Sequence, residues 1–433
     1  MWPVRLACSD RASLSRVLSA CGVVSVIGVL SVPITLGLGP DVVPIQVHAA
    51  EGWGQPAVDA SRVYYLSKRH ELIAVARNSD GEQWRTALGD GAGVTAGTRV
   101  LVEGSTVVAG DDDVFGFDPA SGLPKWRFTS ASRDAAGSYL GHSSGGLVFA
   151  GSRSGRVYAI EAETGTLRWA SSALGDRVLV HAPVVDGGHT RLGNQSGGAD
   201  DGDDRDARGD GRTKGRENDV ADEIAATYIE LDATPRRGGL VLLDGVQGSV
   251  RWRASFPERE PDTAVGAGGA PVFAEAIIAA ASSDGTIYGF DRSSGAIVWT
   301  LPPIGSDDPG GRNATPADDV RALAFADGVI VATSLTGTLV AIDAPTGRER
   351  WRYVSPQDGS IAFAVVSDGR TAFLPYASGR LVAVDLIHGR ARWRVGGSAL
   401  RFEHPPAVSQ HRVYVTSEDG LYAVEDTADA DRP

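Results

Sequence analysis

An eleven-residue phrase that ends in tryptophan recurs in this chain about every 42 residues. Six copies share an acidic residue, a glycine four positions later and a tryptophan four positions after that; they end at Trp126, Trp169, Trp252, Trp299, Trp351 and Trp393. A degenerate copy, with Gly81 displaced by one position, ends at Trp84, so seven of the nine tryptophans belong to the series. Repeats of this length are the sequence signature of a β-propeller.

One repeat holds enough strand-forming segments for a four-stranded sheet. In the copy that ends at Trp299, runs rich in apolar, β-branched and aromatic residues occupy 276–281, 286–290 and 296–299, separated by Gly, Asp and Ser. Such runs predict antiparallel strands joined by tight turns. Pro271 opens a further run, and proline is tolerated where a strand begins because no ladder donor is needed there. Each repeat therefore predicts one four-stranded blade.

The repeated phrase also has a mechanical interpretation. Its acid can accept hydrogen bonds from backbone N–H groups of the following turn, and its glycine is expected at positive φ. Its tryptophan is a large flat ring that can wedge between neighbouring sheets. Because one sheet cannot bury both faces, stacking the blades around an axis is the economical arrangement. We predict a structural role for Trp84, Trp126, Trp169, Trp252, Trp299, Trp351 and Trp393, and for Gly122, Gly165, Gly248, Gly295, Gly347 and Gly389.

The repeats add up to eight blades. Seven end at the tryptophans, and three further strand-like runs begin at Pro406, Arg412 and Gly420. The missing fourth strand can come from residues 42–48, which would close the ring and remove an exposed sheet edge. The predicted fold class is therefore all-β, an eight-bladed propeller of four-stranded antiparallel blades.

The predicted propeller covers residues 42–426 and is followed by a polar tail at 427–433. Before it, residues 1–41 predict a signal or membrane-anchor segment. Three arginines precede an uncharged apolar stretch at 17–39, which is long enough to cross a bilayer as a helix. This order places the propeller outside the cytoplasm. We favour an uncleaved anchor; secretion after cleavage near Ala49 is the alternative, although it would remove the candidate closing strand.

Cysteine content and charge exclude several functions. The only two cysteines, Cys8 and Cys21, lie in the leader, so the exported part has neither disulfides nor thiol chemistry. Cys21 follows a sequence that resembles a lipoprotein processing box, but the apolar segment lies downstream of it rather than upstream. The net charge of −13 argues against a nucleic-acid partner.

The repeats that end at Trp169 and Trp252 are 83 residues apart, yet only one blade is visible between them. His181-Ala-Pro-Val-Val185 predicts its first strand and 226–231 its second. The intervening residues 187–222 are rich in Gly and Asp and predict a disordered, solvated insertion. A calcium loop is the alternative, but arginines interrupt the alternation of oxygen ligands that such a loop needs.

No catalytic constellation stands out from the sequence. The eight histidines are scattered over the blades without metal-ligand spacing: His48, His70, His142, His181, His189, His388, His404 and His411. His181 and His404 lie beside prolines that open innermost strands, so they serve either strand-start packing or a site on the central channel. The acids of the repeated turns recur too regularly to be a catalytic pair, and we predict no catalytic, cofactor-binding or metal-binding residue.

The repeated phrase resembles the tryptophan-docking repeat of the pyrroloquinoline quinone (PQQ) propeller superfamily, most literally at 159–169 and 341–351. In that superfamily the tryptophans interlock successive blades. One branch comprises quinoprotein dehydrogenases that hold PQQ and calcium at the axis beneath a vicinal disulfide. The other comprises non-enzymatic propellers, such as the lipoprotein of the outer-membrane β-barrel assembly machinery, which bind protein partners. Without a cysteine beyond residue 21, this chain resembles the second branch.

Fold alone does not fix function, so three hypotheses remain. The sequence favours a monomeric, membrane-tethered, extracytoplasmic scaffold that binds a protein or cell-envelope component and needs no cofactor. The alternatives are a dehydrogenase that uses PQQ and calcium, and a propeller that binds or hydrolyses polysaccharide.

Overall fold

The computed structural model describes most of the predicted propeller. The described residues are 34–35, 40–77, 81–88, 99–110, 112–130, 139–172, 174–175, 178–186, 221–234, 236–257, 266–304, 320–326, 328–355, 357–361, 365–402, 404–409 and 412–426. The predicted insertion at 187–222, apart from its last two residues, and the predicted tail at 427–433 lie outside this set.

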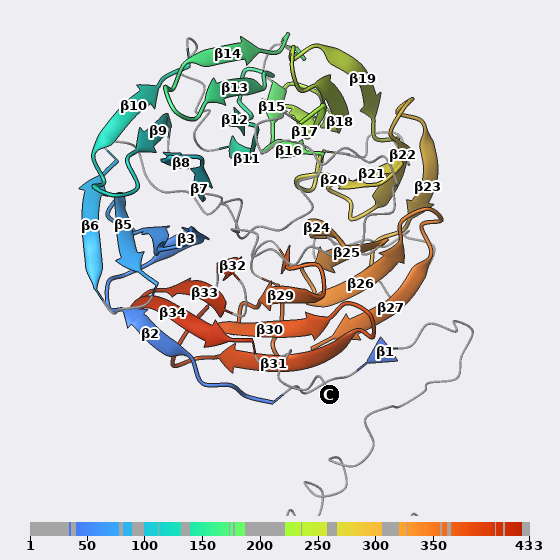
Figure 1. Ribbon diagram of the computed structural model, residues 1–433. Coiled ribbons are helices and arrows are strands. Elements are labelled where there is room, and N and C mark those ends of the chain that lie inside the picture. The colour runs from blue at the N-terminus through green and yellow to red at the C-terminus, as the bar shows by residue number, and fades with distance from the viewer. Residues whose placement is uncertain are drawn as a thin grey trace, which may run out of the picture.

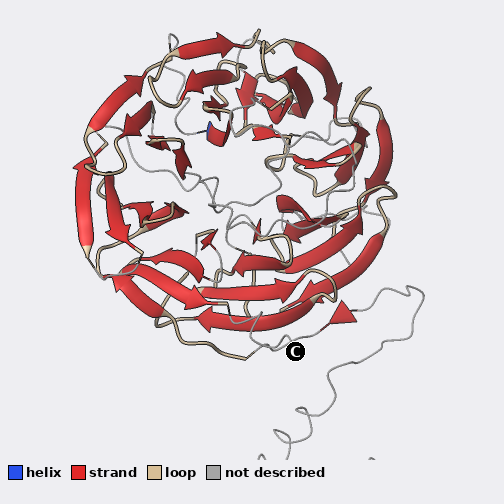
Figure 2. Ribbon diagram, viewed as in Figure 1, coloured by secondary structure: helices blue, strands red, loops and turns tan. Residues whose placement is uncertain are grey.

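Eight antiparallel sheets surround a central axis, and strand is the dominant regular structure of the described chain (Figures 1 and 2). The prediction of an eight-bladed all-β propeller is confirmed. In each blade the first strand lies nearest the axis and the last strand lies at the circumference (Figure 1).

The first four blades follow the order of the chain. Blade 1 contains β3 (Trp53–Val58), β4 (Arg62–Leu66), β5 (Glu71–Ala76) and β6 (Glu82–Ala87). Blade 2 contains β7 (Val100–Glu103), β8 (Thr106–Gly110), β9 (Val114–Phe117) and β10 (Pro124–Phe128). Blade 3 contains β11 (Leu140–Ser144), β12 (Leu147–Ala150), β13 (Tyr158–Glu161) and β14 (Leu167–Ala170). Blade 4 contains β15 (Val178–Val180), β16 (Val184–Val185), β17 (Glu223–Glu230), β18 (Arg237–Asp244) and β19 (Val250–Ser255).

The remaining blades complete the circle. Blade 5 contains β20 (Val272–Ala274), β21 (Ile277–Ala281), β22 (Ile287–Asp291) and β23 (Ile297–Leu301). Blade 6 contains β24 (Val320–Ala326), β25 (Val329–Ser334), β26 (Thr338–Asp343), β27 (Glu349–Val354) and a short outer strand, β1 (Ile34–Thr35). Blade 7 contains β28 (Val366–Ser367), β29 (Thr371–Pro375), β30 (Arg380–Asp385) and β31 (Arg390–Gly396). Blade 8 contains β32 (Ala407–Ser409), β33 (Arg412–Ser417), β34 (Gly420–Glu425) and β2 (Ile45–His48).

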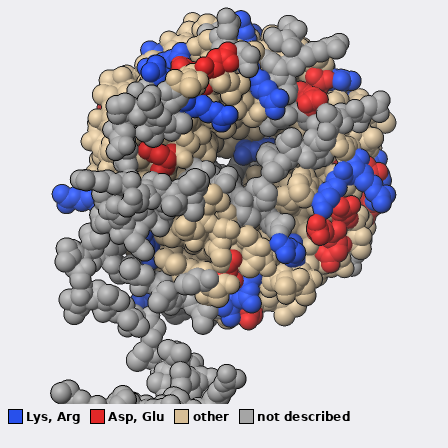
Figure 3. Space-filling model, turned by 180° about the vertical axis from the view of Figure 1, so that it is seen from behind, with Lys and Arg blue, Asp and Glu red and all other residues tan. Residues whose placement is uncertain are grey.

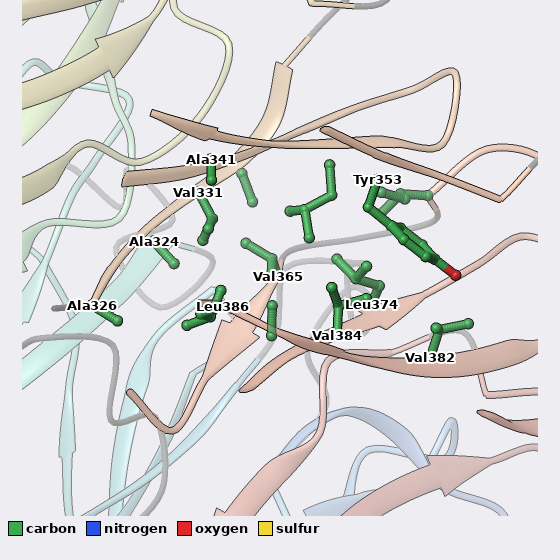
Figure 4. Close-up of a cluster of buried hydrophobic side chains, with 14 of the residues drawn as sticks. Ala324, Ala326, Val331, Ala341, Tyr353, Val365, Leu374, Val382, Val384 and Leu386 are labelled. Atoms are coloured by element: carbon green, nitrogen blue, oxygen red, sulfur yellow. The ribbon is translucent and has the colours of Figure 1, made fainter. Parts of the chain in front are cut away.

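The core is divided among the interfaces between blades. Eight clusters of buried apolar side chains are described, and each draws its members from two neighbouring blades. Figure 4 shows the cluster between blades 6 and 7, in which Val331 and Ala341 of blade 6 face Leu374 and Val384 of blade 7. Middle strands are therefore apolar on both faces, because each face meets a different neighbour.

The ring closes through the N-terminal side of the chain, as predicted. Strand β2 pairs antiparallel with β34 and supplies the fourth strand of blade 8. Ahead of it, Asp41 bridges Arg394 of blade 7, and β1 pairs in parallel with β27 of blade 6. Residues 34–35 and 40–48 thus lie at the outer edges of three successive blades, and we call these two segments the strap.

The predicted membrane helix at 17–39 falls almost wholly outside the described residues. At Ile34–Thr35 the chain is extended rather than helical, because its backbone pairs with the open edge of β27 (Figure 1). Within the described part of the chain, none of the helical structure is long and apolar enough to span a bilayer.

Blade 4 differs in detail from its predicted strands. Its first strand is split into β15 and β16, both paired with β17, and β17 begins at Glu223, three residues earlier than expected. Pro183 lies in the gap, where it can donate no ladder hydrogen bond. Asp186 and Glu223, which flank the insertion, both pair with Arg292 of blade 5, so the base of the insertion is held against the neighbouring blade.

Candidate functional site

The repeated tryptophans lie in the outermost strands and reach across to the next blade. Each indole N–H donates a hydrogen bond at 2.8–3.1 Å, in six cases to the backbone carbonyl that directly follows the turn acid of the next blade. The acceptors of Trp84, Trp126, Trp169, Trp252, Trp299 and Trp351 are Pro119, Ala162, Gly245, Arg292, Ala344 and Leu386. Trp393 differs, because it donates to the side chain of Asp426.

Each of the six predicted glycines lies beneath the indole of the preceding blade. All have φ between 64° and 73°, a region in which side chains are strained. A Cβ atom would come within 2.3–2.7 Å of an indole carbon, the pairs being Gly122 with Trp84, Gly165 with Trp126, Gly248 with Trp169, Gly295 with Trp252, Gly347 with Trp299 and Gly389 with Trp351. The backbone conformation and the packing of the indole ring thus both require glycine at this position.

The acidic side chains of the repeated phrase stabilise the turns in which they lie. Asp118 accepts hydrogen bonds from the backbone N–H groups of Ala120 and Ser121, and Asp244, Asp343 and Asp385 accept equivalent ones. The pKa of Asp291 is lowered by hydrogen bonds from Ser293 and Ser294. Aspartates of this kind lie in the outer turns of five blades, blades 2, 4, 5, 6 and 7, and their hydrogen bonds to backbone N–H groups make them structural acceptors.

The interface between blades 8 and 1 is built differently from the other seven. Its register places Ile45 opposite Ala423, where blade 6 has Trp351 opposite Ala341. Polar contacts replace the indole. His48 Nδ1 lies 2.6 Å from the Tyr65 hydroxyl, Thr416 Oγ1 donates to the carbonyl of Gly54 at 2.8 Å, and Lys68 pairs with Glu418 at 2.7 Å. The sequence marked His48 as the last residue of the candidate closing strand at 42–48 but did not predict these contacts.

The two histidines predicted near the axis lie in different blades. His404, in the approach to blade 8, packs edge-on against Trp53 of blade 1 with ring centroids 4.4 Å apart. His181 lies between β15 and β16 of blade 4, where its backbone N–H donates to Thr227. Burial lowers the pKa of His181 to about 4, so it is neutral at pH 7.

The inner strands are linked to one another by a set of hydrogen bonds that the sequence did not reveal. Gln55 of blade 1 donates to Pro406 O of blade 8 at 3.3 Å and forms a parallel bridge with Arg99 at the start of blade 2. Arg99 Nη1 donates to Gly141 O of blade 3 at 3.2 Å. His142 N then donates to Pro183 O of blade 4 at 3.1 Å. We call Gln55, Arg99 and His142 the axial cluster.

The axial cluster was missed because its members have no fixed spacing in the sequence. The only local signal is an arginine directly before an apolar innermost strand, at Arg99-Val100. Seen from behind the view of Figure 1, the disc is hollowed near its centre, with basic side-chain atoms at the edge of the hollow (Figure 3).

The calcium site implied by the dehydrogenase branch does not fit the described residues. Calcium requires six to eight oxygen ligands, with carboxylates prominent among them. The axial cluster instead offers a guanidinium, an imidazole and an amide. Among the described residues, no three His, Cys, Asp or Glu side chains gather closely enough to hold a metal.

Exposed apolar side chains concentrate at the circumference. Three lie in the turns before outermost strands: Leu123, Val246 and Ile387, with 56–70% of their surface exposed. Three more, Leu167, Ile297 and Val298, lie on β14 and β23 themselves. We call these six residues the apolar rim.

Most of the chain matches one family model. Residues 36–141, 113–206 and 236–432 match the PQQ_2 model, which is described as outer membrane protein assembly factor BamB. No curated protein matches the chain.

Solved structures share the fold at low sequence identity. BamB from Moraxella catarrhalis is 16% identical, with a TM-score of 0.57 and coverage of 88% of this chain and 96% of its own. A europium-containing methanol dehydrogenase is 14% identical, with a TM-score of 0.58 and coverage of 88% and 86%. The computationally designed Ika8 protein is also 14% identical, with a TM-score of 0.59 and coverage of 88% and 99%. At these identities the likeness concerns the fold alone.

Proposed function

We propose that this chain, which belongs to the PQQ_2 family of outer membrane protein assembly factor BamB, is an extracytoplasmic, membrane-tethered scaffold that binds a protein of the cell envelope. The observation that carries the proposal is the apolar rim. Scattered single apolar residues are normal on a protein surface, but here six of them lie in the outer turns or on the outermost strands of five blades, blades 2, 3, 4, 5 and 7. Apolar side chains of this kind form the buried centre of a protein interface.

The backbone beside the rim supports the same function. Outermost strands such as β10 and β23 end their sheets in the described chain, so one side of each carries unpaired N–H and C=O groups. The strap shows that a segment from elsewhere can pair with such an edge, because β1 does so on β27. An extended segment of a partner could add to a blade in the same manner.

The tether is proposed from the part of the apolar stretch that precedes β1, residues 17–33, and the strap explains why it would be retained. Cleavage near Ala49 would remove β2 and leave blade 8 with three strands. N-terminal sequencing of the mature protein tests this part. A mature terminus at or after residue 49 would contradict it.

The rim is tested by changing two of its residues together, Leu123→Asp and Ile387→Asp. Each is more than 60% exposed, so neither substitution disturbs the core. We expect at least about a tenfold loss of affinity for the partner captured from envelope extracts, because apolar anchors dominate binding energy. The measurement is capture followed by titration of the recovered partner.

Leu231→Asp is the matched control for the rim. Leu231 is 38% exposed and lies in the turn between β17 and β18, at the opposite end of the sheet from the turns of the rim. It should leave binding unchanged. Equal loss in both variants, or no reproducible partner, would contradict the proposal, as would dye reduction by alcohols or aldoses after addition of PQQ and calcium.

A further inference from the structure

Arg99 is fixed at the axis by three blades. It precedes β7 of blade 2, bridges Gln55 of β3 and donates through Nη1 to Gly141 of β11. Its side chain keeps an intermediate degree of exposure although protein surrounds it, which is the situation of a group that lines an internal hollow. Nη1 is held by a backbone carbonyl, and no hydrogen bond or ion pair joins the Nε–Nη2 edge of the guanidinium to a described residue.

No carboxylate of the described chain balances this charge. All the salt bridges found there involve other basic residues, and the pKa of Arg99 is lowered to about 10 by burial alone. A guanidinium at pH 7 remains charged even so, and an unpaired buried charge is costly. By contrast, Arg292, another interior arginine, pairs with two carboxylates.

A neighbouring histidine adds no charge of its own to this site. His142 is buried, and burial together with the charge of Arg99 lowers its pKa to about 3, so it is neutral at pH 7. Its Nδ1 has no hydrogen-bond partner among the described residues. The axial cluster therefore combines the guanidinium of Arg99, whose charge is not balanced, with the neutral imidazole of His142. An anion with oxygen atoms could balance that charge and accept hydrogen bonds from these groups.

We propose that the axial cluster binds a singly charged oxyanion, namely the carboxylate group of a small molecule, at Arg99. One edge of a guanidinium presents two parallel N–H donors that match the two oxygens of a carboxylate. The net charge of −13 disfavours entry of multiply charged anions, which selects a monocarboxylate over a phosphate dianion. This site is separate from the apolar rim and does not depend on the proposed partner.

The test is a calorimetric titration of the full-length protein with sodium acetate, with sodium chloride at equal ionic strength as the background. We expect saturable binding at one site per chain. Arg99→Gln should weaken it at least about tenfold, because a hydrogen bond to a charged group is lost. Arg153→Gln is the matched control: it removes the same charge from an exposed turn of blade 3, where Arg153 donates to Tyr139, and should leave acetate binding unchanged.

Four results would overturn the proposal. Acetate that does not bind, or that binds equally well to Arg99→Gln, would show that Arg99 is not an anion site. Tighter binding of inorganic phosphate through Arg99 would overturn the choice of a carboxylate. If Arg99→Gln fails to fold, modification of the native protein by phenylglyoxal decides: acetate should slow the reaction at Arg99 relative to Arg153, and equal rates would refute the site.

Discussion

At the scale of single residues, two separate constraints act on the turn glycine of the repeat: its backbone conformation and its contact with an indole. The glycine of each outer turn adopts positive φ and also lies under an indole, as Gly347 does beneath Trp299. Blade 6 allows the two constraints to be separated. Gly328 has nearly the same φ, 73° against 69°, but an added Cβ would meet no atom within 4 Å.

We therefore expect Gly347→Ala to cost about 2–4 kcal/mol of unfolding free energy, the sum of left-handed strain and overpacking. Gly328→Ala should cost only the strain, about 1–2 kcal/mol. Urea unfolding of both variants measures the difference. Equal losses would mean that the contact with Trp299 contributes nothing.

His142 predicts how stability depends on pH. Its folded-state pKa is lowered to about 3, while an unfolded histidine titrates near 6.5, so the unfolded state binds more protons between these values. Stability should therefore fall as pH falls below about 6.5, by up to about 1.4 kcal/mol per pH unit from this residue. His142→Gln should reduce the slope of unfolding free energy against pH by the contribution of this residue.

The region above pH 7 provides the internal control for this prediction. Both proteins should change in parallel there, because His142 is then neutral in both states. An unchanged slope between pH 6 and pH 4 in the variant would show that His142 does not resist protonation. Chemical denaturation at each pH is the measurement.

At the scale of elements, the strap decides how the circle is completed. β2 pairs with β34 over three residues and brings His48 to Tyr65 and Glu82 of blade 1. β1 and Asp41 add contacts to blades 6 and 7 only at their outer edges. The fourth strand of blade 8 should therefore contribute more to the free energy of unfolding than the outer part of the strap does.

Two truncations separate these parts of the strap. Removal of residues 1–41 should cost less than about 1 kcal/mol, because it loses mainly an exposed ion pair and a two-residue pairing. Removal of residues 1–49 should cost about 2–4 kcal/mol, since several backbone hydrogen bonds of blade 8 are lost. Unfolding transitions of the soluble truncations measure both. Equal stability would show that β2 is dispensable for closure.

At the scale of the whole molecule, a tryptophan of the repeat packs at seven of the interfaces between blades, and the eighth has another design. Indole rings pack at the seven, whereas the cluster between blades 8 and 1 contains no tryptophan and is bordered by polar contacts. The eighth interface joins the two ends of the circle, so it brings together segments from opposite ends of the chain. These hydrogen bonds can form only when the ring is complete.

The sequence predicted well those features that repeat locally. The blade count, the order of strands and the closing role of β2 all follow from periodicity, because each blade is a contiguous segment with its own turn signals. Blade 4 shows the limit of this approach: Pro183 split its first strand, and the start of β17 was placed three residues late. A single interrupted copy of a repeat gives too little pattern to fix its boundaries.

What the sequence determined by itself is therefore the fold, since the spacing of acid, glycine and tryptophan encodes a sheet that can be stacked. Only the tertiary structure brought together Gln55, Arg99 and His142, which come from three blades and have no common motif. The physical reason is the closed ring: it converges the first strand of every blade on one axis, so residues far apart in the chain meet there. Whether the charge of Arg99 is balanced depends on the distances between side chains of different blades, and a local sequence pattern cannot predict these distances.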